Sequence, residues 1–144
     1  MTHTVTYTVS TDKTKLDRAL VHRFLTTSYW AEGRSRELVD ASVEGSLCFG
    51  VYAGDEQVGF ARVVTDYATS AYLADVFIPE PHRGKGLSGR LLRAVLEHPE
   101  LQTCSWTLFT RDAHGLYERF GFECPAELER LMRRKPVSTK PLML

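Results

Sequence analysis

The sequence predicts a single α+β (mixed α/β) domain, and three observations support this fold class. The chain has 144 residues, 43% of them hydrophobic and 25% charged, which suffices for one core and hardly for two. Segments with the period-2 pattern of strands are interspersed with segments that have the period of amphipathic helices. No repeat, linker or low-complexity segment divides the chain. We therefore expect residues 1–144 to form one domain in which helices flank a mixed sheet.

The N-terminal third is expected to form one strand and two helices. Residues 4–10 alternate polar and apolar side chains, as a half-buried strand does. Thr11 and Asp12 can cap the segment that follows, where apolar residues recur every four positions and predict an amphipathic helix. A second short helix is expected over residues 35–42, after Gly33.

Three strands are expected in the middle of the chain. Residues 47–53, 58–64 and 72–78 are rich in β-branched and aromatic side chains. The first two are separated by a polar four-residue connection that begins at Gly54, which is typical of a hairpin. We therefore expect antiparallel pairing in this part of the sheet.

The C-terminal third is expected to add two helices and one strand. A helix with an apolar face follows the glycine-rich segment 83–89, and residues 104–110 alternate like a strand. Residues 113–120 predict a short helix that stops at Gly121, the position of a left-handed C-terminal cap. Residues 128–133 fit a helix or a strand equally well.

The charge balance argues against a polyanionic partner. Lys plus Arg and Asp plus Glu each number 18, so neither nucleic acid nor an anionic membrane is expected to bind. The first ten residues lack the basic and apolar parts of a secretory signal, and no stretch is apolar enough to span a bilayer. We therefore expect a cytoplasmic protein.

The cysteines do not form a recognisable framework. Cys48, Cys104 and Cys124 are odd in number and have neither CxxC nor CxxH spacing, which argues against disulfides and against a zinc site. We expect three reduced thiols and no bound metal. A catalytic cysteine stays an open alternative, although no neighbouring residue marks an activating base.

A glycine-rich loop is the strongest chemical signal in the sequence. Gly84 and Gly86 stand between an expected strand and an expected helix, where free backbone N–H groups and the helix dipole favour a pyrophosphate. Arg83, Lys85 and Arg90 supply local positive charge. The alternative is a glycine-rich turn with solvated charges. Neither a Walker loop nor a dinucleotide-binding GxGxxG is present.

Two segments resemble motifs of the GNAT acetyltransferase family. Residues 83–88, RGKGLS, are similar to its motif A, [QR]xxGx[GA], with Ser88 where glycine or alanine is commoner. Residues 113–122, AHGLYERFGF, are similar to its later AxxLYxxxGF pattern. The resemblance spans at least residues 47–122, and the order and spacing of the two motifs make it more specific than either alone.

The resemblance implies an architecture and a co-substrate. The GNAT-like acyl-CoA N-acyltransferase fold is a twisted mixed sheet of about six to seven strands, open between the strand ending at Ile78 and the strand at 104–110. Acetyl-CoA is expected in that opening, with its pantetheine arm paired to strand backbone. The implied cofactor-binding residues are Val76, Phe77, Ile78, Arg83, Gly84, Lys85, Gly86, Leu87, Ser88, Gly89 and Tyr117.

Catalytic roles can also be assigned to particular residues. Tyr117 matches the family tyrosine beside the CoA sulfur that is taken as the general acid; the alternative is that it only packs in its helix. Asp75 is the preferred general base, because a charge within an apolar strand is costly without a purpose or a partner. A salt-bridged or solvent-facing Asp75 is the alternative, and Glu32 is a second base candidate.

The loop between the first two helices commonly lines the acceptor pocket in the family. Here it contains Tyr29, Trp30 and Glu32, which we predict to bind the substrate. Two aromatic rings beside charges suggest a small polar acceptor with an apolar part, such as an amino acid or a related amine. The alternative is that these rings are core or dimer-contact residues.

The predicted function is therefore direct transfer of an acetyl group from acetyl-CoA to a primary amine of a small molecule or amino acid. Two alternatives remain: acetylation of protein lysines or N-termini, and a non-catalytic acyl-CoA sensor. Family members often dimerise, so a homodimer is expected by analogy.

Overall fold

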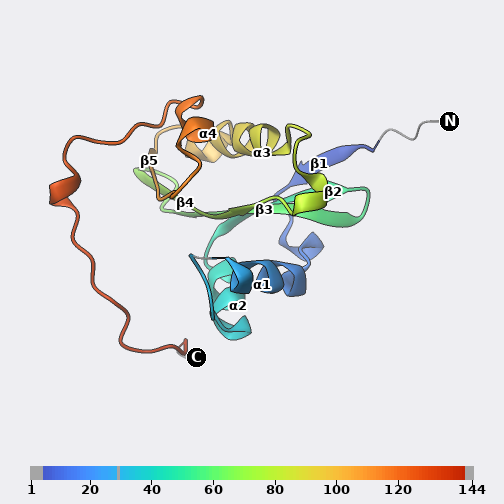
Figure 1. Ribbon diagram of the computed structural model, residues 1–144, viewed down its shortest axis with the longest axis horizontal. Helices are drawn as coiled ribbons and strands as arrows, with labels where there is room; N and C mark the ends of the chain where they lie inside the picture. The colour runs from blue at the N-terminus through green and yellow to red at the C-terminus, as the bar shows by residue number, and fades with distance from the viewer. Residues whose placement is uncertain (1–4, 29, 142–144) are drawn as a thin grey trace.

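A computed structural model describes residues 5–28 and 30–141, in which one sheet lies between helices (Figure 1). The five strands, in spatial order, are β1 (Tyr7–Ser10), β2 (Leu47–Ala53), β3 (Glu56–Thr65), β4 (Ser70–Phe77) and β5 (Ser105–Leu108). The helices are α1 (Arg18–Thr27), α2 (Arg36–Glu44), α3 (Leu87–Leu96) and α4 (His114–Glu118). α1 and α2 cover one face of the sheet, and α3 and α4 lie on the other.

Each face of the sheet has its own hydrophobic core. The first core lies on the α3 side, where the apolar face of α3 packs on β2, β3 and β4. The second lies on the other side, where α1 and α2 pack on Phe60 and Phe77. The Phe77 ring also stacks on Phe24 of α1, with centroids 4.1 Å apart. Burial on both faces explains why β2 and β3 read as nearly continuous apolar runs.

β4 contains a β-bulge near its C-terminal end. The register with β3 shifts between Phe60 and Arg62, so that Asp75 and Val76 together oppose one residue of β3. Asp75 has a φ of 54°, in the left-handed region that residues other than glycine rarely occupy. The bulge therefore changes the direction of the β4 backbone just before the strand ends.

The sheet opens between β4 and β5, as the resemblance implied. The two strands are parallel and pair from Ser70 with Ser105 to Leu73 with Leu108. Residues 74–77 of β4 continue beyond this ladder without a paired partner in β5. Their backbone on that side is available to a ligand.

The sheet has five strands in the described residues, which corrects the expected count of six to seven. After Phe122 the chain runs extended around the molecule, and residues 123–140 are all exposed (Figure 1). This segment is dense in charged side chains, whose burial without partners is costly, and it contains only the short turn Leu128–Arg130 among its described residues.

The start of the first helix also differs from the prediction. The cap expected at residues 11–12 was placed too early, because Asp12 caps a 3-10 turn at Lys13–Lys15. α1 begins at Arg18, and the Asp17 carboxylate caps it. Two polar residues in close succession can each cap a helix, and the apolar spacing alone does not decide between them.

Gly59 of β3 is expected to be essential for close packing. A Cβ at this position would lie 2.7 Å from Cδ1 of Ile78 and 3.0 Å from Cβ of Val51. We expect Gly59→Ala to lower the free energy of unfolding by about 1–3 kcal/mol in urea denaturation. Gly45→Ala is the control, because its Cβ would lie 3.6 Å from its nearest neighbour, the Ala41 carbonyl oxygen, which is an ordinary van der Waals contact. Equal losses in the free energy of unfolding of Gly59→Ala and Gly45→Ala would show that overpacking at Gly59 is not the cause.

Candidate functional site

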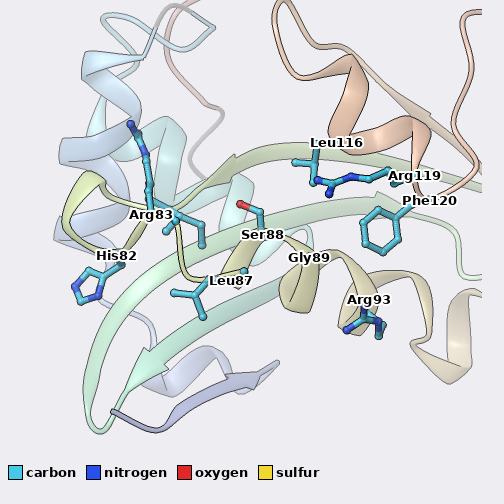
Figure 2. Close-up of a pocket in the computed structure, with 12 residues that line it drawn as sticks. His82, Arg83, Leu87, Ser88, Gly89, Arg93, Leu116, Arg119 and Phe120 are labelled. Carbon is cyan, nitrogen blue, oxygen red and sulfur yellow. The ribbon is translucent and has the colours of Figure 1, made fainter. Parts of the chain in front are cut away.

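The two motifs come together around one cavity of about 450 Å³. Figure 2 shows the loop before α3 on one side and residues of α4 and its C-terminal turn on the other. The lining residues are Ile78, His82, Arg83, Gly84, Gly86, Leu87, Ser88, Gly89, Arg93, Leu116, Arg119 and Phe120. Segments about thirty residues apart in the sequence thus form one site, which we call the first cavity.

The loop of the first cavity has the backbone shape that its glycines predict. Gly84 and Gly86 have φ values of 78° and 73°, and a Cβ at either position would meet no atom within 4 Å. The glycines are therefore required by conformation and leave the backbone open to the cavity. Gly86 is also the N-cap residue of α3, so the free N–H groups of the first helical turn face this region.

The positive charge around the first cavity comes partly from residues that the sequence did not single out. Arg83, Arg93 and Arg119 line it (Figure 2). Arg93 follows Gly89 by four positions and so lies on the same face of α3. This spacing could have identified Arg93 from the sequence. Arg119 lies just after α4, and only the packing of α4 beside the loop brings it here.

Two of the predicted cations face elsewhere. Lys85 donates from Nζ to the Tyr7 hydroxyl at 3.3 Å, and Arg90 donates to the Tyr7 carbonyl oxygen at 2.9 Å. Both side chains therefore contact β1, and neither is among the cavity-lining residues. Arg83 does line the cavity, and its Nε donates to the Ile78 carbonyl oxygen at 2.8 Å, which closes the loop onto the end of β4.

Tyr117 lies on α4 next to the first cavity but is not among its lining residues. Its ring is half-buried against the first core and makes an edge contact with Phe122, with centroids 5.9 Å apart. The Tyr117 carbonyl oxygen accepts hydrogen bonds from the backbone N–H groups of Phe120 and Phe122. Gly121, with a φ of 89°, allows this tight turn, as the sequence predicted.

A second cavity, of about 620 Å³, lies at the loop between α1 and α2. Its lining residues are Trp30, Ala31, Glu32, Gly33, Arg34, Ser35, Glu37, Leu38, Thr139 and Lys140. The predicted substrate-binding residues Trp30 and Glu32 thus share one cavity, and Tyr29 lies outside the described residues. The first cavity is lined by residues of α3 and α4 and the second by residues of α2 and the loop before it. Figure 1 shows these helices on opposite faces of the sheet.

Asp75 is at the centre of a buried ion cluster. Its carboxylate accepts hydrogen bonds from Trp30 Nε1 at 3.0 Å, Arg34 Nη1 at 3.0 Å and Arg62 Nε at 2.9 Å. Its side chain is only 2% exposed. The Asp75 charge therefore has the partners that its place in an apolar strand requires. The sequence analysis did not identify Arg34 or Arg62 as these partners.

Burial raises the pKa of the Cys48 thiol to about 11, which keeps it protonated near neutral pH and unsuited to be a nucleophile. Among the described residues, no three His, Cys, Asp or Glu side chains gather as metal ligands. No described helix is long and apolar enough to cross a membrane.

Comparisons with known proteins agree with the motif resemblance. The family model for the acetyltransferase (GNAT) domain matches residues 44–124. A solved structure from Xanthomonas campestris pv. campestris, assigned to the GNAT family as a candidate acetyltransferase, is 47% identical with a TM-score of 0.88. The match covers 91% of this chain and 94% of the Xanthomonas chain.

Two further similarities are more distant. The spermine/spermidine N(1)-acetyltransferase of Bacillus subtilis (strain 168) is 33% identical over 93 residues, which are 56% of this chain and 61% of that protein. The chain spans 61% to 62% of the length of the curated relatives that it matches. A solved structure of a GNAT family acetyltransferase from Elizabethkingia anophelis with acetyl-CoA bound is 18% identical, with a TM-score of 0.59. The match covers 83% of this chain and 76% of that chain, and at this identity it supports the fold alone.

Proposed function

Because the chain belongs to the GNAT acetyltransferase family, we propose that it transfers the acetyl group of acetyl-CoA directly to a primary amine of a small molecule or amino acid. The observation that carries the proposal is the first cavity, where both motifs meet at the open end of β4. Such a site can hold the phosphates of a nucleotide and lead its arm toward the gap in the sheet.

The first cavity fits the charged end of acetyl-CoA. Its open glycine backbone and the N-terminus of α3 suit a pyrophosphate. Arg83, Arg93 and Arg119 add cations that can pair with phosphate oxygens. The thioester supplies the activated acetyl group. On the β5 side, the backbone of residues 76 and 77 has no strand partner and offers hydrogen bonds to the pantetheine arm and to the thioester carbonyl, whereas the Ile78 carbonyl oxygen already accepts from Arg83.

The transfer needs one proton removed and one supplied. The amine nitrogen forms a bond to the acetyl carbon, the C–S bond breaks, and the electron pair leaves with the sulfur. We assign Tyr117 to donate a proton to that thiolate, since α4 holds it beside the first cavity. Glu32, which is exposed and lines the second cavity, is the base candidate with access to an incoming amine.

A polyamine is a second candidate acceptor. The Bacillus subtilis relative is named for spermine and spermidine, and two carboxylates, Glu32 and Glu37, line the second cavity beside Trp30. Carboxylates and an aromatic face both attract ammonium groups. A homodimer and a cytoplasmic location stay predictions.

A substrate panel tests the proposed function. We expect release of CoA thiol from acetyl-CoA, followed with a thiol reagent, when the correct amine is added from a set of amino acids, polyamines, aminoglycosides and lysine peptides. Thermal stabilisation by CoA, measured in parallel, checks cofactor binding. Stabilisation without release by any acceptor would favour the sensor alternative, and the absence of both would contradict the proposal.

A further inference from the structure

We infer that Asp75 is a positioning residue that holds the acceptor-side loop, residues 30–34, against the β4 bulge, and that it does not remove the amine proton. This replaces the role of general base that the sequence suggested for it. The inference rests on the proposed transferase function for its kinetic consequence, and on the contacts of Asp75 for its structural part.

The contacts of Asp75 join three parts of the chain. Oδ1 accepts from the Trp30 indole, and Oδ2 accepts from both Arg34 and Arg62. Trp30 and Arg34 belong to the loop between α1 and α2, whereas Arg62 belongs to β3 and also donates to Ser46 Oγ at 3.1 Å. One carboxylate thus fixes the loop to two adjacent strands.

The burial of the cluster leaves Asp75 poorly placed to act as a base. The Asp75 side chain is 2% exposed, against 24% for Arg34 and 13% for Arg62. A general base must approach the proton that it removes within about 2.6–3.2 Å, directly or through one water. Both oxygens of Asp75 already accept hydrogen bonds, and its partner Arg34 lines the second cavity whereas Asp75 itself does not.

The position of Asp75 explains what the cluster holds in place. Asp75 carries the left-handed φ of the bulge, and the residues after it, 76 and 77, are those proposed to receive the thioester. The loop that it fixes supplies Trp30, Glu32 and Arg34 to the second cavity. The cluster therefore sets the distance between the proposed acceptor side and the open half of β4.

Kinetics of Asp75→Asn separate positioning from base catalysis. For a positioning residue we expect the KM of the amine to rise by about 10-fold or more, while the KM of acetyl-CoA stays within about twofold. A base would instead show a loss of about 100-fold or more in kcat with an unchanged amine KM. That second result would overturn the inference.

A double variant adds a rescue test. Asp75→Asn leaves two partly buried cations without their carboxylate, and adding Arg34→Gln restores the net charge of the cluster. We expect the double variant to recover at least about threefold in amine kcat/KM over Asp75→Asn alone. If the losses in amine kcat/KM of the two single variants simply multiplied in the double variant, the inference would be contradicted. Arg36→Gln is the matched control, since Arg36 pairs with Asp40 on the surface of α2.

Trp30→Phe provides a milder variant in case Asp75→Asn does not fold. It removes one hydrogen bond from Asp75 and leaves all three charges in place. We expect a rise of about threefold in amine KM with CoA stabilisation retained. An unchanged amine KM would count against the positioning role.

A spectroscopic measurement tests the loop contact without turnover. The chain has two tryptophans, so the indole N–H resonance of Trp30 can be assigned with Trp106→Phe. We expect its hydrogen exchange to accelerate by about 10-fold or more in Asp75→Asn, because the buried acceptor is altered. An unchanged rate would overturn the inference. Faster exchange in a protein that shows no turnover with any amine would refute the proposed function and leave the loop contact standing.

Discussion

Gly86→Asp is expected to abolish acetyl-CoA binding, with a loss of at least about 100-fold in affinity for CoA. The side chain would project into open space at the N-terminus of α3, where the phosphates are proposed to lie. Two unit charges of like sign 4 Å apart repel by about 4 kcal/mol near a protein surface, which exceeds the about 2.7 kcal/mol of a 100-fold change. Isothermal titration with CoA measures the effect.

Two controls separate charge from backbone strain in this experiment. The Asn side chain has nearly the same shape as that of Asp, and both residues tolerate the left-handed conformation better than most, so for Gly86→Asn we expect a smaller loss of CoA affinity, about 10-fold or less. Gly54→Asp places the same carboxylate at another left-handed glycine, with a φ of 60°, in the β2–β3 hairpin. We expect it to bind CoA as the unaltered chain does. Equal losses of CoA affinity in Gly54→Asp and Gly86→Asp would show that the effect does not depend on the position of the added charge.

Tyr117→Phe is expected to lower kcat by about 100-fold while the affinity for CoA changes by less than about threefold. The ring keeps its packing on the first core and its contact with Phe122, whereas the hydroxyl that is proposed to protonate the departing thiolate is lost. Steady-state kinetics with the acceptor found in the panel, combined with CoA titration, measure both quantities.

The pH profile and a matched tyrosine sharpen the Tyr117 experiment. A general acid controls the alkaline limb of a pH–rate profile, so that limb should shift or disappear in Tyr117→Phe. Tyr67→Phe changes an exposed tyrosine in the turn between β3 and β4 and should leave kcat unaltered. Turnover equal to that of the unaltered chain at every pH would remove Tyr117 from the mechanism.

Local signals predicted the framework well. The strand at 47–53 has the bounds that its composition predicted, and Gly84, Gly86 and Gly121 all have positive φ values where the turns required them. The order of strands and helices also agrees with the structure. Such features depend on backbone preferences over a few residues, which periodicity and glycine positions record directly.

Non-local features were predicted less well. Residues 128–133 fitted either a helix or a strand, yet the described residues of the tail run exposed outside the sheet and form only a short turn at Leu128–Arg130. Asp75 was identified as unusual because it interrupts an apolar strand, but its partners Arg34 and Arg62 carried no signal in their own neighbourhoods. A buried charge shows in the sequence that a partner is needed and does not show which residue it is.

The sequence by itself determined the fold class, the order of the elements and the position of the glycine-rich loop, because each follows from local spacing and turn chemistry. Only the tertiary structure decided which charges face the first cavity. Lys85 and Arg90 turn to Tyr7 of β1, whereas Arg119, which follows α4, reaches the cavity. The physical reason is that a long side chain adopts the direction set by segments packed beside it. Those segments are distant in sequence, and only the folded sheet brings them together.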